Sequence, residues 1–186
     1  MIFASKLKFF FYQNFDFVLG IGLLAEVIPV VCEKFKNVHW IIGGSGPLWV
    51  LMEQTIERHG LYDRVEMLGA VPHHKVRDVF VRGHIFVNPS LTEAFCIAIV
   101  EAASCGLVVV STNVGGIPEV LPDHMIHLSD PVPDSFTNLV CTAIETQILC
   151  EKGPPDVWEM HREVKRMYSW YEVAQRTEKV EDKFRK

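Results

Sequence analysis

Two glutamates, Glu93 and Glu101, stand eight residues apart in a stretch that is otherwise largely apolar. The pattern predicts one helix from Glu93 to Cys105. On such a helix the pair lies only about 80° apart around the axis, so both carboxylates can face one cleft. Burying a lone carboxylate costs several kcal/mol unless it is paired. Two interpretations stay open: a glutamate bonded within the core, or a carboxylate at Glu101 that accepts hydrogen bonds from a vicinal diol such as a ribose.

The backbone at the start of this predicted helix is a candidate for binding an anion. The first N–H groups, near Ala94, Phe95 and Cys96, have no partner within the helix. Together with the positive end of the helix dipole they suit a phosphate group. Because every helix has such an end, and most ends bind only water or a cap, this signal is weak by itself.

A glycine-rich turn at Gly43-Gly44-Ser45-Gly46-Pro47 follows an apolar run and precedes a helical pattern, as phosphate-binding turns do. It lacks the G-x-G-x-x-G spacing, and the chain has no G-K-[ST] sequence. A P-loop and a standard dinucleotide site are therefore not supported. Glycines here allow the backbone to approach either a ligand or a neighbouring strand, and both interpretations stay open.

These residues fall within an alternation of short apolar runs and helical patterns. Strands are predicted at residues 38–42, 64–68, 85–87, 107–111 and 125–128, and helices at 48–59, 74–81 and 93–105. Strands that are apolar on both faces and separated by helices favour a doubly wound, Rossmann-like α/β fold with a parallel sheet. In such sheets ligands bind at the carboxyl ends of the strands.

The two ends of the chain follow a different pattern. After Asp130, helices are predicted at 135–149 and 157–179, around a break at Gly153-Pro154-Pro155. The first residues either supply a first strand or form a leader. We divide the chain into a leader (1–19), a ligand-binding α/β domain (20–130) and a C-terminal helical extension (131–186).

The composition excludes several classes of protein. A formal net charge of −5 argues against a general nucleic-acid or anionic-membrane binder. The five cysteines are scattered without a C-x-x-C pair, which indicates reduced thiols rather than disulfides or a zinc site. No histidines have metal-ligand spacing, and no G-x-S-x-G nucleophile turn occurs. The uncharged run from Phe17 to Ala25 has about half the length of a membrane-spanning helix.

Three segments together resemble the C-terminal, donor-binding half of retaining GT-B glycosyltransferases of family 4. They are Ile41–Pro47, the Glu93/Glu101 pair and the loop Val114-Gly115-Gly116-Ile117-Pro118-Glu119-Val120. The resemblance covers about residues 20–180. Segments 83–86, 90–96, 99–106 and 176–180 are similar to the branch of this family that begins the synthesis of GPI anchors.

The resemblance implies transfer of N-acetylglucosamine from UDP-N-acetylglucosamine to phosphatidylinositol by front-side displacement, without a metal ion. It also implies a complex with other subunits at the cytosolic side of the endoplasmic reticulum membrane. Glu93 would act as the catalytic residue facing the donor sugar and diphosphate, and Glu101 would hold the ribose hydroxyls. The other implied donor-binding residues are Phe95, Cys96 and Ile97 beside the phosphates, Val71 beside the uracil, and Gly44.

The sequence departs from the family just before Gly20. The family carries an arginine and a lysine that reach the diphosphate, where this chain has Asn14 and Leu19, and Val18 replaces another basic residue. Losing one such donor costs about 2.7–4 kcal/mol of transition-state stabilisation. We therefore expect a truncated form, without the acceptor domain and the membrane helix of the family, that turns over feebly by itself. The alternative is a non-catalytic protein that engages the other subunits. An NAD-dependent dehydrogenase is disfavoured because G-x-G-x-x-G and Tyr-x-x-x-Lys are absent.

Overall fold

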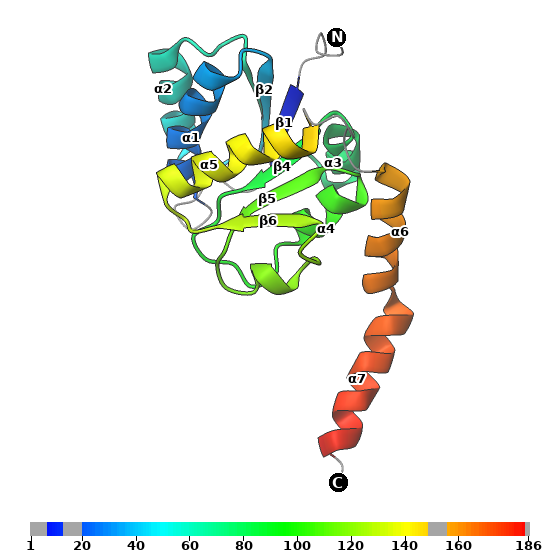
Figure 1. Ribbon diagram of the computed structural model, residues 1–186. Helices are drawn as coiled ribbons and strands as arrows, with labels where there is room; N and C mark the ends of the chain where they lie inside the picture. The colour runs from blue at the N-terminus through cyan, green and yellow to red at the C-terminus, as the bar shows by residue number, and fades with distance from the viewer. Residues whose placement is uncertain (1–6, 13–19, 149–155, 185–186) are drawn as a thin grey trace.

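A six-stranded parallel sheet forms the centre of the computed structural model, which describes residues 7–12, 20–148 and 156–184. The spatial order of the strands is β3-β2-β1-β4-β5-β6 (Figure 1). The strands are β1 (Leu7–Tyr12), β2 (Val38–Gly43), β3 (Val65–Gly69), β4 (Ile85–Asn88), β5 (Val108–Thr112) and β6 (Ile126–Ser129). All neighbouring pairs are parallel. This confirms the predicted doubly wound α/β fold.

Helices cover both faces of the sheet, and each face has its own apolar cluster. One cluster joins the sheet to α1 (Ile21–Lys34), α2 (Trp49–His59) and α5 (Pro133–Ala143), and α5 continues into the π-helical turn η2 (Ile144–Ile148). The other joins it to α3 (His73–Phe80), α4 (Ile97–Ser104), the short 3-10 turn η1 (Ile117–Glu119) and α6 (Val157–Met167). Because both faces are covered, the strands are almost wholly apolar, as parallel sheets require.

Strand β1 comes from the segment that the sequence analysis set apart as a leader. It pairs with β2 along its whole length and with β4 at Phe9 and Phe10. Phe9 and Phe11 are fully buried, and the ring of Phe9 stacks on that of Trp40 with centroids 4.6 Å apart. Residues 7–12 therefore supply the first strand, which was one of the two alternatives. Asn14, Val18 and Leu19 lie outside the described residues, so the prediction about them stays a prediction.

Two boundaries of the predicted helices are wrong. The helix predicted from Glu93 begins instead at Ile97, because Cys96 adopts a left-handed backbone conformation that helical residues cannot share. The helix predicted over 157–179 is interrupted: α6 ends at Met167 and α7 (Trp170–Phe184) follows after Tyr168 and Ser169. The predicted break at 153–155 lies outside the described residues. Helix α1 was not predicted, because its nearly continuous apolar run gives little periodic signal.

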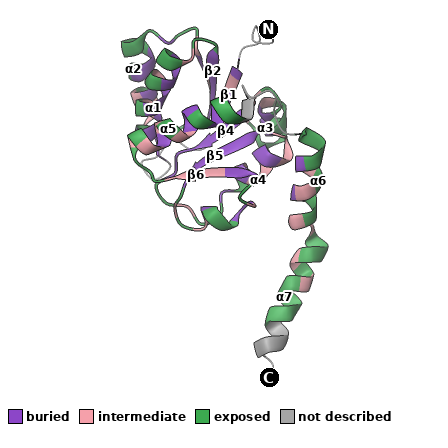
Figure 2. Cartoon of the chain, in the orientation of Figure 1, coloured by how far each residue is buried: buried purple, intermediate pink, exposed green. Residues whose placement is uncertain are grey.

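The helical extension predicted after residue 130 divides into a packed part and a projecting part. Helix α5 contacts β5, β6 and α1, with Phe136 and Val140 fully buried, so the cover of the sheet continues past residue 130. Helix α7 points away from the body and has no buried residue among those whose burial is described (Figures 1 and 2). Within the described part of the chain, no helix combines the length and the apolar character needed to cross a membrane.

Candidate functional site

The strand order puts the switch point of the sheet between the carboxyl ends of β1 and β4. From these two neighbours the chain leaves towards helices on opposite faces, α1 and α4, and ligands of doubly wound sheets bind where this occurs. Gly20, which directly precedes α1, touches the loop that follows β4. Gly20 has a φ of +73°, and a Cβ on it would lie 1.8 Å from the carbonyl oxygen of Pro89. Only glycine fits at this contact.

A buried polar network fixes the loop after β4. Asn88 Nδ2 donates to Ser111 Oγ at 2.9 Å, and Ser90 Oγ donates to Asn88 Oδ1 at 2.9 Å. Thr112 Oγ1 donates to the carbonyl oxygen of Ser90. All four residues have no exposed surface. Because the removal of any of these hydroxyls or of the amide takes a partner from a buried group, the network ties this loop firmly to the end of β5. Ser111 was predicted only as the end of a strand and Thr112 lies just beyond that strand, so neither was predicted to hold this loop.

The glycine pair after β5 meets the turn that holds Glu93. The N–H of Gly116 donates to the carbonyl oxygen of Glu93 at 3.0 Å. A Cβ on Gly116 would lie 2.0 Å from the carbonyl oxygen of Ala94, and one on Gly115 would lie 2.0 Å from that of Glu93. The two glycines therefore allow two backbone segments to touch directly. The motif was recognised in the sequence, but this partner could not be read from it.

The carboxylate of Glu93 lies against its own turn. Its Oε1 accepts the N–H of Ala94 at 2.9 Å and that of Phe95 at 3.4 Å. Two backbone donors thus converge on one anionic oxygen at the start of α4. Because Glu93 precedes the helix, the predicted arrangement of both glutamates on one helix is wrong.

Cys96 redirects the chain between this turn and α4. It is buried and has φ 59°, and no other residue except glycine has a positive φ within 7–12, 20–148 and 156–184. A non-glycine residue in this conformation costs about 1–2 kcal/mol, which the surrounding packing must offset. Helix α4 then starts at Ile97, whose side chain is 67% exposed. The residue type gives no warning of this conformation.

Glu101 lines a pocket between α3 and α4. The pocket holds about 330 Å³, and its lining includes His73, Arg77, Glu101, Ser104 and Cys105. Burial raises the pKa of the Cys105 thiol, and the positive charge of Arg77 partly offsets this. Glu101 and Glu93 are both half-buried, and neither lies in the buried core. Neither is therefore a core glutamate, but Glu93 is not among the residues that line the Glu101 pocket, so the interpretation that both carboxylates face one cleft stays a prediction.

Gly44 and Val71 lie at the same edge of the sheet but on the other side of β1. The buried Gly44 follows β2 and donates its N–H to the carbonyl oxygen of Gly69 at 2.7 Å. Val71 follows β3 and is half-buried against the second apolar cluster. Val71 follows β3, which is three strand spacings or roughly 14 Å from β4, and Gly44 follows β2, which is two spacings or roughly 10 Å from β4. The strand order therefore sets both residues apart from the Glu93 turn. The candidate site therefore has two separate parts.

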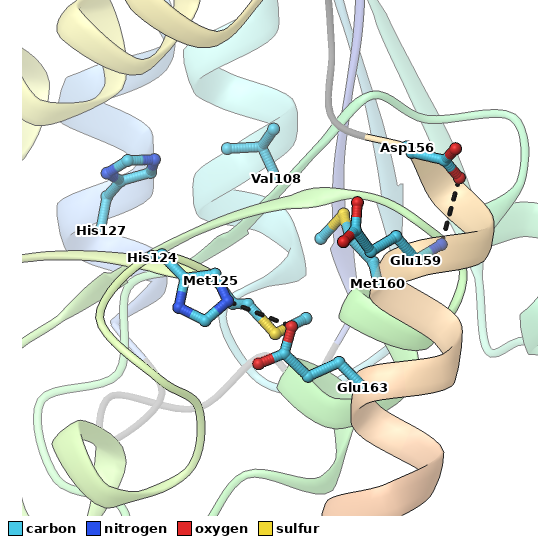
Figure 3. A pocket seen from close by; sticks show the side chains of 8 residues that line it. All are labelled: Val108, His124, Met125, His127, Asp156, Glu159, Met160 and Glu163. Carbon is cyan, nitrogen blue, oxygen red and sulfur yellow. Dashed lines mark hydrogen bonds and ion pairs between the residues drawn. The ribbon is translucent and has the colours of Figure 1, made fainter.

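A second pocket, of about 230 Å³, lies where α6 meets the end of the sheet (Figure 3). His124 Nε2 and Glu163 Oε2 are 3.1 Å apart there, and Asp156 accepts the N–H groups of Trp158 and Glu159 as the cap of α6. No three histidine, cysteine or acidic side chains in the described parts of the chain are grouped as a metal site would require. The His124–Glu163 contact joins α6 to the body, and the Asp156 contacts cap the helix itself.

A doubly wound sheet with glycine-assisted loop contacts, and with a turn at its switch point whose N–H groups hold the Glu93 carboxylate, defines a Rossmann-like domain. Residues 2–153 match the family of glycosyl transferases group 1, so the chain belongs to this family. It is similar to a phosphatidylinositol N-acetylglucosaminyltransferase subunit of Arabidopsis thaliana, with 57% identity over 164 residues, 88% of this chain and 36% of that protein. The corresponding protein from Homo sapiens, which has the same name, is 52% identical over 166 residues, 88% of this chain and 34% of that protein. The chain thus spans about a third of the length of these relatives.

Solved structures share the fold. HepE of Anabaena, crystallised in complex with UDP, matches with a TM-score of 0.79 and 20% identity over 97% of this chain and 50% of that one. The pneumococcal O-GlcNAc transferase GtfA, in complex with UDP and GlcNAc, matches with a TM-score of 0.75 and 14% identity over 96% of this chain and 36% of that one. The predicted GT-B-type architecture is therefore confirmed.

Proposed function

We propose that this chain binds the donor UDP-N-acetylglucosamine at the carboxyl edge of the sheet, for transfer of N-acetylglucosamine to phosphatidylinositol. The observation that carries the proposal is the convergence of the Ala94 and Phe95 N–H groups on one anionic oxygen, in a turn held by Gly115 and Gly116. The reaction is the one that the names of the similar plant and human proteins give.

In this proposal the diphosphate takes the backbone donors that Glu93 now occupies. The carboxylate of Glu93 turns away and accepts hydrogen bonds from the donor sugar. The N–H of Phe95 and the backbone of Cys96 and Ile97 then face the phosphates at the positive end of α4. Preorganised donors of this kind stabilise the charge that develops on the leaving diphosphate, and this stabilisation commonly contributes most to the rate of such a reaction.

The front-side route assigns each bond and proton. The bond from the anomeric carbon to the diphosphate oxygen breaks while a bond to an inositol hydroxyl oxygen forms on the same face. The hydroxyl proton passes to the departing diphosphate. We expect no metal ion to be needed, because backbone donors and the helix end offset the charge.

The nucleoside end of the donor is assigned to the other residues. We propose that the half-buried Glu101 accepts hydrogen bonds from both ribose hydroxyls, as a single carboxylate can. Val71 would contact the uracil, and the buried backbone of Gly44 would let the nucleotide approach the end of β2 closely.

Calorimetric titration of the 186-residue chain with UDP tests this proposal. We expect Glu101→Gln to weaken UDP binding by about tenfold or more, since it replaces charge-assisted hydrogen bonds with neutral ones. Glu66→Gln is the matched control, because Glu66 is exposed and pairs only with Arg82 among the contacts identified. Absence of any UDP binding by the unaltered chain would contradict the proposal, as would equal binding of UDP by both variants.

A second candidate is a non-catalytic role in a complex with other subunits at the cytosolic face of the endoplasmic reticulum membrane. Large exposed aromatic side chains on α6 and α7 favour it: Trp158, Trp170 and Tyr171 are 71%, 87% and 69% exposed. Co-purification with such subunits in the absence of UDP binding would support this role. A chain that binds UDP and elutes alone would contradict it.

A further inference from the structure

One side chain at the junction of α6 and α7 contacts two loops at the candidate site. One is the Glu93 turn (residues 93–96), and the other is the loop that follows Gly115 and Gly116. The ring of Tyr168 packs edge-on against the ring of Phe95, with centroids 5.6 Å apart and planes at 79°. Its hydroxyl donates to the carbonyl oxygen of Val120. Phe95 belongs to the Glu93 turn, and Val120 directly follows the glycine loop and η1. Tyr168 therefore bridges two segments that otherwise meet through the backbone of Gly115 and Gly116.

Tyr168 is itself held from outside the site. Its N–H donates to the carbonyl oxygen of Val164, a buried residue of α6, at 3.0 Å. Arg176 of α7 donates to the carbonyl oxygen of Met167 at 3.1 Å, directly before Tyr168. Burial raises the pKa of the Tyr168 hydroxyl, so the group stays protonated and able to donate at neutral pH. The backbone at Tyr168 is thus held by α6 and α7, while its side chain reaches the two loops.

We propose that Tyr168 is a positioning residue of the donor site. By holding the ring of Phe95 and the carbonyl group of Val120, it keeps the Glu93 turn and the glycine loop in register, so that the N–H groups of Ala94 and Phe95 converge on one point. The inference rests on the proposed function, because it takes that point to be the position of a donor phosphate. Tyr168 touches no reacting atom and acts through its two partners.

Removing only the hydroxyl of Tyr168 distinguishes a positioning role from the simple filling of an apolar space. Tyr168→Phe keeps the ring against Phe95 and removes only the bond to Val120. We expect it to weaken UDP binding by about fivefold, the equivalent of one hydrogen bond. We also expect faster amide hydrogen exchange confined to residues 93–97 and 114–121. Tyr168→Leu, which also removes the edge-on ring contact, should have a larger effect of the same kind.

Tyr171→Phe is the matched control. Tyr171 is 69% exposed, and its hydroxyl accepts a hydrogen bond from Gln175 within α7 and contacts neither loop. We expect this variant to leave both UDP binding and loop exchange unchanged. Phe95→Leu approaches the same contact from the other side and should reproduce the exchange pattern of Tyr168→Leu. In the double variant, the two effects should not add.

Amide hydrogen exchange and UDP binding are separate measurements, so the role of Tyr168 can be judged apart from the proposed function. If the unaltered chain binds no UDP, the proposed function fails, and the exchange pattern alone decides whether Tyr168 orders the two loops. If Tyr168→Phe and Tyr168→Leu both match Tyr171→Phe in exchange and binding, the inference is overturned. It is also overturned if exchange in both variants rises equally across β4 and β5, since that marks a general loss of packing.

Discussion

The two edges of the same parallel sheet are built in opposite ways. At the carboxyl edge, glycines bring backbones into direct contact, and Asn88, Ser90, Ser111 and Thr112 form a buried polar network. At the amino edge lies a pocket of about 380 Å³, which is larger than the pocket of about 330 Å³ that Glu101 lines. Charged and aromatic side chains line it, including Lys8, Tyr62, Asp63 and Glu66. The ion pair there, Arg82 with Glu66, is exposed.

The volume of a pocket is therefore not enough to identify a binding site in this protein. The ion pair of the amino edge is exposed to solvent, so its two side chains are poorly suited to hold donors in fixed directions. At the carboxyl edge, the backbone N–H groups are held in place by backbone contacts so close that a Cβ on Gly115 or Gly116 would not fit. Preorganised donors are what binding of a phosphate and stabilisation of a leaving group require.

The largest expected effect comes from adding a single methyl group at the carboxyl edge. Gly116→Ala would place its Cβ 2.0 Å from the carbonyl oxygen of Ala94, a backbone atom that cannot move aside alone. We expect a loss of about 3 kcal/mol in the free energy of unfolding, since the two segments must separate and the Gly116–Glu93 hydrogen bond breaks. Urea unfolding measures this, and UDP titration should show binding lost.

Gly22→Ala is the matched control for this change. Gly22 lies in the first turn of α1, and a Cβ there would meet nothing within 4 Å. Alanine is favoured over glycine in a helix by up to about 1 kcal/mol, so this variant should be neutral or slightly stabilised. If Gly116→Ala and Gly22→Ala had equal free energies of unfolding, the close contact at Gly116 would not matter for stability.

A smaller effect is expected from the buried network. Thr112→Val removes the hydroxyl that donates to Ser90 and leaves that buried carbonyl oxygen without this donor. The cost should be about 1–3 kcal/mol in the free energy of unfolding. Arg82→Gln at the amino edge breaks an exposed ion pair and should cost no more than about 1 kcal/mol. Urea unfolding of both variants measures the two costs. A larger loss of unfolding free energy for Arg82→Gln than for Thr112→Val would contradict this expectation.

The smallest effect is a pH dependence that belongs to the amino edge. Burial lowers the pKa of His84, whose Nδ1 accepts the N–H of Lys8, and burial also lowers that of His127. Between these lowered values and the ordinary value of 6.5, the unfolded chain binds more protons than the folded chain. Stability should therefore fall as pH drops below about 6.5.

His84→Asn tests this dependence, because asparagine offers an acceptor for the Lys8 N–H without titrating. Its unfolding free energy, measured by urea denaturation across this pH range, should fall less steeply than that of the unaltered chain. Identical slopes for the two proteins would show that His84 does not contribute.

The sequence determined the class of fold because strands apolar on both faces and stop signals such as Gly60 are local patterns. Gly60 ends α2 in the left-handed conformation that glycine adopts at little cost. The E-x7-E pair and the G-G-I-P-E loop were equally legible, since recognition of a motif needs only residue types and spacing. These features of the sequence were sufficient to indicate the family.

Only the tertiary structure decided where those motifs meet. The start of α4 at Ile97 depends on the left-handed backbone of Cys96, which a residue of that type adopts only when surrounding packing imposes it. The contact of Gly116 with Glu93 and the bridge from Tyr168 to Phe95 join segments far apart in the chain. Such contacts leave no periodic signal, because they arise from the geometry of the assembled sheet and not from the preferences of neighbouring residues.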